Sequence, residues 1–162
     1  YYLGMNLGQL ADTKRNGSAL KIVHEMEAEF KAAHDIDERF DYAGPDRNLG
    51  LLYAQAPSLV SIGSRTKARQ HLRRASELAP DYPENRLNLI EAYLKWGDRS
   101  GAWREYKAPE GIWPDAHKKL AGDEWAASWV GWENGLRPIK KKLPEESVTV
   151  ESVKSPKHAD TE

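Results

Sequence analysis

The sequence predicts an all-α fold, an α-α superhelix of about three helix pairs followed by a Trp-rich C-terminal capping helix. A recurring asparagine–leucine pair marks the repeat, at Asn6-Leu7, Asn48-Leu49 and Asn88-Leu89. The first two copies lie 42 residues apart (48 − 6) and the next two lie 40 apart (88 − 48). A period of this length is typical of helix-pair repeats, whose units bury their apolar faces only by stacking on one another.

The first helix pair is expected over about 1–14 and 19–34. Leucines recur at i, i+4 and i+7 in its first helix, which predicts one apolar face made of Leu3, Leu7 and Leu10. The second helix carries an apolar stripe of the same kind, made of Ile22, Met26, Phe30 and Ala33. We expect these two stripes to face the interior.

Turn and capping residues delimit the second pair. Gly44-Pro45-Asp46 opens its first helix, which is expected to end near Ala56-Pro57. Ser64 is a suitable N-cap for its second helix, because a serine hydroxyl can accept a hydrogen bond from a free backbone N–H in the first turn. The buried stripe of that helix is predicted to be Ala68, Leu72 and Ala75.

The third pair begins at Pro83, a residue type that is favoured in the first turn of a helix. Its first helix is expected to stop at Gly97, because glycine readily takes the backbone conformation that ends a helix. A short second helix is expected over about 100–107.

Four of the six tryptophans follow within 20 residues: Trp113, Trp125, Trp129 and Trp132. The last three recur at helical spacing, so segment 108–143 is expected to contain a helix that caps the open end of the stack. An aromatic box for a sugar or a cationic ligand, or an oligomer interface, are the alternatives. Pro138 is expected to kink or end this helix. Residues 144–162 contain few large apolar side chains and are expected to be extended or disordered.

The residues inside the copies resemble the tetratricopeptide repeat. Leu49-Gly50-x-x-Tyr53 is similar to the first helix of that motif, and Ala68-x-x-x-Leu72-x-x-Ala75-x-x-x-x-Pro80 is similar to its second. The first copy departs from the motif, with Ala11 and Glu38 in place of the tyrosine and the proline. The resemblance implies three tetratricopeptide-like helix pairs over 1–107 and a scaffold that binds other proteins.

A narrower resemblance is carried by Tyr1–Gly8, Phe40–Arg47 and Leu78–Asn85. These stretches look like the bacterial exported helical-repeat proteins that are grouped with the T component of TRAP-type transporters. The resemblance implies a periplasmic or otherwise extracytoplasmic location, although the chain itself contains no signal peptide. It also implies a possible link to solute uptake.

Composition narrows the classes of partner. The 24 Lys and Arg residues nearly balance the 25 Asp and Glu residues, which leaves a net charge of −1. This balance predicts no general attraction to nucleic acid or to an anionic membrane. The chain contains no cysteine, which excludes disulfides and thiolate chemistry. No apolar run approaches the ~20 residues that cross a bilayer, so an integral membrane protein is not expected.

No pattern indicates an enzyme, a cofactor or a metal site. His24-Glu25 lacks the second histidine of a zinc-protease helix, the glycines form no phosphate loop, and no serine is placed beside a base. We therefore expect no catalytic residue, no cofactor and no metal. His24, Glu27 and His34 would bind a metal only if folding brought further ligands to them.

The asparagines of the repeat are the first candidate binding residues. In the family, their position lies on the helix that lines the concave face, so Asn6, Asn48 and Asn88 would project from successive helices. An amide both donates and accepts, and can pair with the backbone of an extended peptide. Arg47, beside Asn48, would add a charge for an acidic group. The alternative is that these amides bond within the protein and hold the pitch of the repeat.

A weaker candidate is the basic stripe formed by Arg65, Arg69 and Arg73, which recur at i, i+4 and i+8. A solvated outer face and a docking face for an acidic partner are both open. Nucleic acid is not expected, because aromatic residues do not alternate with these arginines and the net charge does not favour it.

Three functions therefore remain open. The first is a non-enzymatic protein-binding module that uses its concave face. The second is an accessory component of solute uptake that binds a small organic anion, and the third is a structural subunit of a larger assembly. The expected partner is another protein or peptide, and a homo-oligomer is possible.

Overall fold

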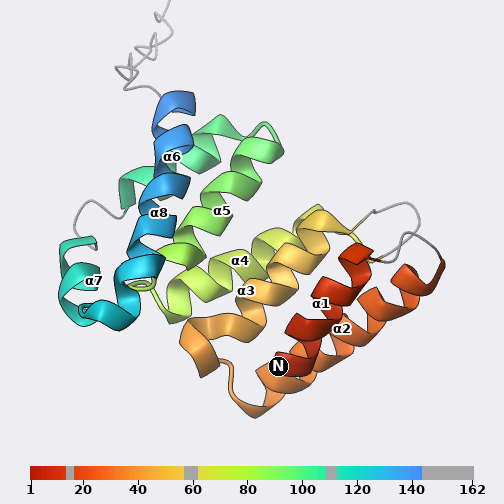
Figure 1. Cartoon of the computed structure of the whole chain (residues 1–162). Coiled ribbons are helices and arrows are strands. Elements are labelled where there is room, and N and C mark those ends of the chain that lie inside the picture. Colours follow the sequence, from red (N-terminus) through yellow and green to blue (C-terminus); the bar gives the residue numbers. More distant parts are fainter. Residues whose placement is uncertain (14–16, 57–61, 109–112, 144–162) are drawn as a thin grey trace, which may run out of the picture.

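In the computed structural model, the all-α prediction is confirmed over the residues that the structure describes, 1–13, 17–56, 62–108 and 113–143 (Figure 1). These residues form eight α-helices and no strand: α1 (Tyr2–Thr13), α2 (Gly17–Ile36), α3 (Phe40–Gln55), α4 (Arg65–Leu78), α5 (Pro83–Lys95), α6 (Arg99–Lys107), α7 (Trp113–Lys119) and α8 (Asp123–Lys142). The predicted tail, 144–162, and most of the insertion between the helices of the second pair lie outside the described residues.

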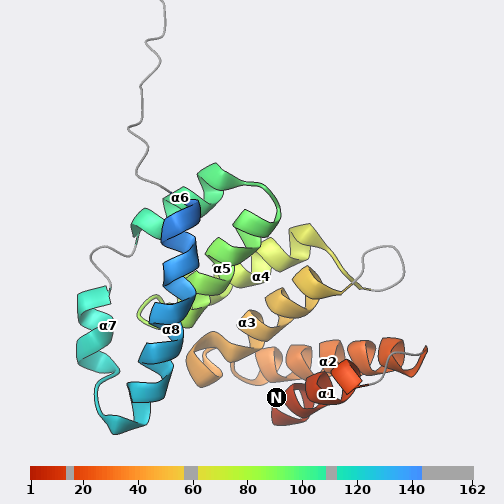
Figure 2. The same cartoon turned by 45° about the horizontal axis from the view of Figure 1, so that its top comes forward.

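The helices pack in chain order, as a stack of helix pairs requires. α1 packs on α2, α3 on α4 and α5 on α6, and contacts of α2 with α3 and of α4 with α5 join successive pairs. α3 also contacts α5, so the first helices of neighbouring pairs lie side by side. Figures 1 and 2 show α1 and α2 at one end of the stack and α7 and α8 at the other.

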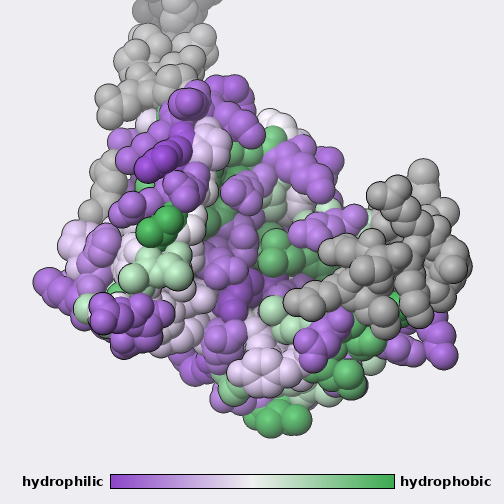
Figure 3. Space-filling model, in the orientation of Figure 1, coloured by the Kyte–Doolittle hydropathy of each residue, from purple (hydrophilic) through white to green (hydrophobic). Residues whose placement is uncertain are grey.

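The predicted apolar stripes of α2 and α4 face the interior. Ile22 and Phe30 are buried on α2, and Met26 packs against the same cluster. Ala68, Leu72 and Ala75 are each 0 % exposed. Their burial fixes which face of α4 turns toward α3. The arginines lie beside this face: Arg65 and Arg73 are exposed, and Arg69 is half-buried. Hydrophilic residues cover much of the molecular face that Figure 3 shows.

Close contact between α3 and α4 depends on Gly50. A Cβ atom at this position would lie 2.6 Å from Cγ of Leu72 and 3.0 Å from the backbone nitrogen of the same residue. The backbone of α3 at Gly50 therefore packs directly against the Leu72 side chain of α4, and no residue larger than glycine fits at this position. This contact belongs to the most extensive helix–helix interface of the molecule.

The predicted helix ends are also found. The Ser64 hydroxyl accepts a hydrogen bond from the backbone N–H of Lys67 at 3.3 Å and caps α4. Pro83 is the first residue of α5. Gly97 follows the C-terminal end of that helix with a φ of +77°, in the left-handed region that glycine enters without strain.

The entry to α3 is unusual, because three successive non-glycine residues are left-handed. Asp41, Tyr42 and Ala43 have φ values of 49°, 54° and 62°, and regular helix follows from Gly44-Pro45. Such a conformation costs about 1–2 kcal/mol per residue, so surrounding contacts must hold it. We call Asp41–Ala43 the left-handed turn.

The Trp-rich segment contains two helices, α7 and α8, rather than one. Trp125, Trp129 and Trp132 face the main hydrophobic cluster, and α8 packs against α5. The ring of Trp132 meets that of Tyr82 edge to face at 5.3 Å. The capping helix thus covers apolar surface of the third pair, as its spacing of tryptophans predicted.

Two local expectations differ from the structure. Of the two outcomes expected at Pro138, a kink or a helix end, the helix end is wrong: α8 continues to Lys142, where the last turn buries Ile139 against the cluster and Arg99 donates a hydrogen bond to the Lys142 carbonyl at 2.8 Å. Leu3 was predicted to face inward but is 56 % exposed. Gly4 takes the inward position on α1, where a Cβ atom would lie 2.8 Å from the ring of Phe30.

Exchanging Gly50 for alanine tests the α3–α4 contact. We expect Gly50→Ala to lower the free energy of unfolding by about 1–3 kcal/mol, because the added methyl group overpacks the interface. Gly131→Ala is the matched control, since Gly131 also lies in a helix but has no atom within 4 Å of its Cβ position. It should be neutral or stabilise by up to about 1 kcal/mol. Chemical denaturation measures both, and equal effects would contradict the packing described above.

Candidate functional site

A groove lies between α2 and α4, with α3 at its floor. It encloses about 650 Å³ and is lined only by polar side chains: His34, Glu38, Asp46, Thr66, Arg69, Gln70, His71, Arg73, Arg74 and Glu77. We call it the α2–α4 groove. Its walls come from three successive helices of the stack, so stacking itself creates it.

The floor of the groove is a buried carboxylate between two imidazoles. Asp46 is 1 % exposed, and its two oxygens lie 3.0 Å from Nδ1 of His34 and 2.6 Å from Nδ1 of His71. Because an ionised carboxylate only accepts hydrogen bonds, each ring donates from Nδ1. Asp46 lies in the first regular turn of α3, where the helix dipole also favours a negative charge.

Ion pairs line the rim. Arg74 donates from one Nη atom to both carboxylate oxygens of Glu38, at 2.8 and 3.0 Å. Arg73 lies 3.6 Å from Glu77 one turn further along α4, and both of these side chains are exposed. Both are surface ion pairs of the kind that contribute little to stability, and the Arg74–Glu38 contact is the shorter.

Arg69 differs from the other arginines of the groove. Its guanidinium lies over the rings of Tyr93 and Trp96, at 5.5 and 5.6 Å from their centroids, and its Nε has no hydrogen-bond partner. Among the described residues, no carboxylate forms an ion pair with it. Arg69 is therefore a positioned cation whose charge is not neutralised by direct contact.

A second polar cluster surrounds Arg47, which is 5 % exposed. Its guanidinium donates to the carbonyl oxygens of Asp41 and Tyr42, both at 3.2 Å, and to Oδ1 of Asn85 at 3.1 Å. It also pairs with the Asp41 carboxylate at 2.9 Å and lies 4.9 Å from the centre of the Tyr82 ring. Arg47 thus fastens the left-handed turn to α5.

Neighbouring side chains complete this cluster. Asn85, which is fully buried, donates to the carbonyls of Tyr42 and Ala75 at 2.9 and 3.1 Å. The Tyr1 hydroxyl donates to the Asp41 carboxylate and accepts from Asn48. Burial, reinforced by the hydrogen bond to Asp41, raises the pKa of Tyr1 above its ordinary value.

The four residues predicted to bind a partner on the concave face have different surroundings. Asn6 is exposed, and Asn88 is half-buried with an Nδ2 atom that has no hydrogen-bond partner. Asn48 donates to the Gly44 carbonyl at 2.8 Å and to the Tyr1 hydroxyl at 3.1 Å, and Arg47 is occupied as described. Only Arg47 and Asn48 thus share a cluster, and their hydrogen bonds are made within the chain. That the four residues bind a partner stays a prediction.

Two members of the basic stripe, the half-buried Arg69 and the exposed Arg73, line the α2–α4 groove. Arg65, one turn earlier, is exposed and lies 5.8 Å from the centre of the Trp96 ring. The partner class of the stripe stays a prediction.

No sequence pattern indicated a binding role for Glu38, Asp46 or His71. His34 and Glu38 are four residues apart, which is a recognisable spacing, but α2 ends between them at Ile36. His71 lies 25 residues beyond Asp46 and reaches it only because α4 packs on α3. No residue pattern within one helix would have revealed the cluster.

No known protein-family model matches this chain, and no curated protein matches it. None of the described helices is both long and apolar enough to cross a bilayer.

Truncating Arg47 tests the second cluster. We expect Arg47→Ala to lower the free energy of unfolding by about 2–3 kcal/mol, because the buried Oδ1 of Asn85 and the carbonyl of Asp41 lose the donor that Arg47 provides. Arg73→Ala is the control, since it removes the same side chain from an exposed position and should change stability by less than about 0.5 kcal/mol. Urea denaturation compares them, and a wild-type stability of Arg47→Ala would show that this residue is free to serve a partner instead.

Proposed function

We propose that this chain is a non-enzymatic binding module that takes up an acidic segment of another protein in the α2–α4 groove. The observation that supports this most directly is Arg69, a guanidinium held by aromatic rings without a carboxylate partner in the described chain. Arg73 lies one turn away on the same face and makes only a weak pair. Guanidinium groups recognise carboxylates by paired hydrogen bonds, which suits an acidic partner.

The lining of the groove supports a polar ligand. Sites for drug-like small molecules are mostly apolar, whereas all ten side chains that line this groove carry polar atoms. A groove between helices also suits a peptide segment, which can lie along it. A small organic anion remains the competing ligand, and the test below distinguishes the two.

The location of the proposed site differs from the one inferred from the family resemblance. Arg47 and Asn48, the central residues of the predicted concave-face site, donate their hydrogen bonds within the chain. Arg69 forms no ion pair with a described residue, and we therefore place the partner on the face of α4 that carries it. The tetratricopeptide-like repeat supports a scaffold role, because stacked helix pairs commonly serve as binding surfaces. The extracytoplasmic location stays a prediction.

A labelled peptide provides the test. We expect a fluorescein-labelled peptide of alternating glutamate and glycine to bind in a fluorescence-anisotropy titration, and the matching lysine–glycine peptide not to bind. Affinity should fall as salt is raised, because salt screens the attraction between the arginines and the peptide carboxylates. The net charge of −1 gives the rest of the molecule no general attraction for an acidic peptide. Free glutamate should not compete at equal carboxylate concentration if a peptide segment is the ligand.

Paired charge reversals locate the site. Arg69→Glu with Arg73→Glu should weaken binding of the acidic peptide by about tenfold or more, since both changes turn attraction into repulsion. Arg137→Glu with Lys140→Glu makes the same change of charge on exposed residues of α8 and should have little effect. Equal losses in the two variants would mean that binding follows overall charge, and the groove would be rejected as the site.

A further inference from the structure

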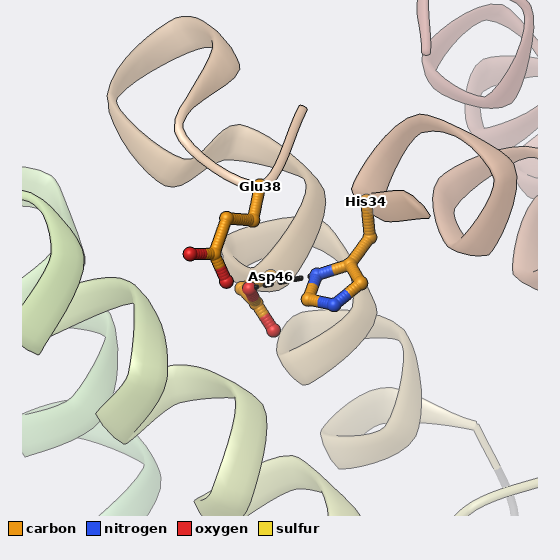
Figure 4. Close-up of side chains that lie close together, drawn as sticks. All are labelled: His34, Glu38 and Asp46. Atoms are coloured by element: carbon orange, nitrogen blue, oxygen red, sulfur yellow. Dashed lines mark hydrogen bonds and ion pairs between the residues drawn. The ribbon is translucent and has the colours of Figure 1, made fainter. Parts of the chain in front are cut away.

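We infer that the floor of the α2–α4 groove is a binding site for a divalent first-row transition-metal ion, with His34, Glu38 and Asp46 as its ligands. One nitrogen or oxygen ligand atom from each of these residues lies within 4.8 Å of the other two. Figure 4 shows the carboxyl groups of Glu38 and Asp46 converging beside the ring of His34. The inference does not rest on the proposed peptide binding.

The spacing of the ligand atoms is close to that of a bound ion. Imidazole nitrogen and carboxylate oxygen bind such ions at about 2.0–2.2 Å, which places neighbouring ligand atoms roughly 3–3.5 Å apart. Nδ1 of His34 and a carboxylate oxygen of Asp46 are 3.0 Å apart, joined by the Nδ1 proton. An ion would take the place of this proton, which passes to solvent. Small rotations of the two side chains would then direct both ligand atoms at the ion, and Glu38 would supply the third.

Two further residues hold these ligands in position. His71 donates from Nδ1 to the other oxygen of Asp46 at 2.6 Å, the arrangement by which a neighbouring residue orients a metal-binding carboxylate. Arg74 bonds to both oxygens of Glu38. A carboxylate has about four lone-pair sites, so Glu38 can bind an ion and keep its contact with Arg74. The nearby positive charge of Arg74 will lower the affinity.

The kind of donor favours Mn²⁺, Co²⁺ or Zn²⁺. One imidazole with two carboxylates suits first-row ions, whereas Ca²⁺ takes six to eight oxygen ligands, more than this floor offers. Asp46 is buried at the N-terminal end of α3, and a cation beside it would further stabilise a charge that the two imidazoles, the helix dipole and Arg74 already favour. Remaining coordination positions would open into the groove.

Metal titration of the full chain tests the inference. We expect isothermal titration calorimetry with Zn²⁺ alone, and with Mn²⁺ alone, to show one saturable site for at least one of these ions. His34→Gln and Glu38→Gln each remove a ligand and should weaken binding by about 100-fold or more. His71→Phe removes only an orienting residue and should weaken it by about 10–100-fold.

His24→Gln is the matched control, because His24 lies on the same helix, is exposed and is not part of the cluster. It should bind the metal as wild type does, and circular dichroism should show every variant folded. Absence of a saturable site in the wild type would overturn the inference. So would equal binding by wild type, His34→Gln and Glu38→Gln, or an equal loss in His24→Gln. No peptide is present, so a failure here leaves the peptide proposal standing, and the reverse also holds.

Discussion

The guanidinium of Arg47 is buried where α3 leaves its left-handed turn, and its hydrogen bonds join that turn to α5. Three left-handed residues in succession are unfavourable on their own. Arg47 and Asn85 satisfy the turn's carbonyl oxygens, and Tyr1 brings the N-terminal end of the chain to the same cluster. Arg47 therefore joins the start of the second helix pair to the third, and the Tyr1 hydroxyl joins the first pair to the same cluster.

The same turn also positions the groove. Asp46 and Arg47 are consecutive residues of α3, so their side chains project in directions about 100° apart around the helix. Arg47 therefore reaches toward α5, while Asp46 reaches the opposite neighbours, His34 of α2 and His71 of α4. One buried charge stabilises the stack and the adjacent one forms the floor of the α2–α4 groove. The two proposals use different parts of this groove, its basic wall on α4 and its acidic floor on α3.

Periodicity and capping residues predicted the helices well, because both act locally. Ile22, Phe30 and Leu72 are buried as their spacing predicted, and Ser64 and Gly97 lie at the helix ends assigned to them. Pro138 shows where local rules fail. A proline removes one backbone hydrogen bond, but burial of the following turn against α5 offsets that loss, and this burial is set by residues far away in the chain.

The sequence by itself determined the all-α class, the stacking of helix pairs and the inward stripe of tryptophans. Tertiary structure alone decided the sites. Arg47 was itself predicted to bind a partner on the concave face, yet it lies in the interior beside a left-handed turn that no local pattern predicted. His34, Asp46 and His71 come from three helices and meet only because α2 and α4 both pack on α3. Helix formation depends on neighbours in sequence, whereas a cluster of polar side chains depends on how helices cross.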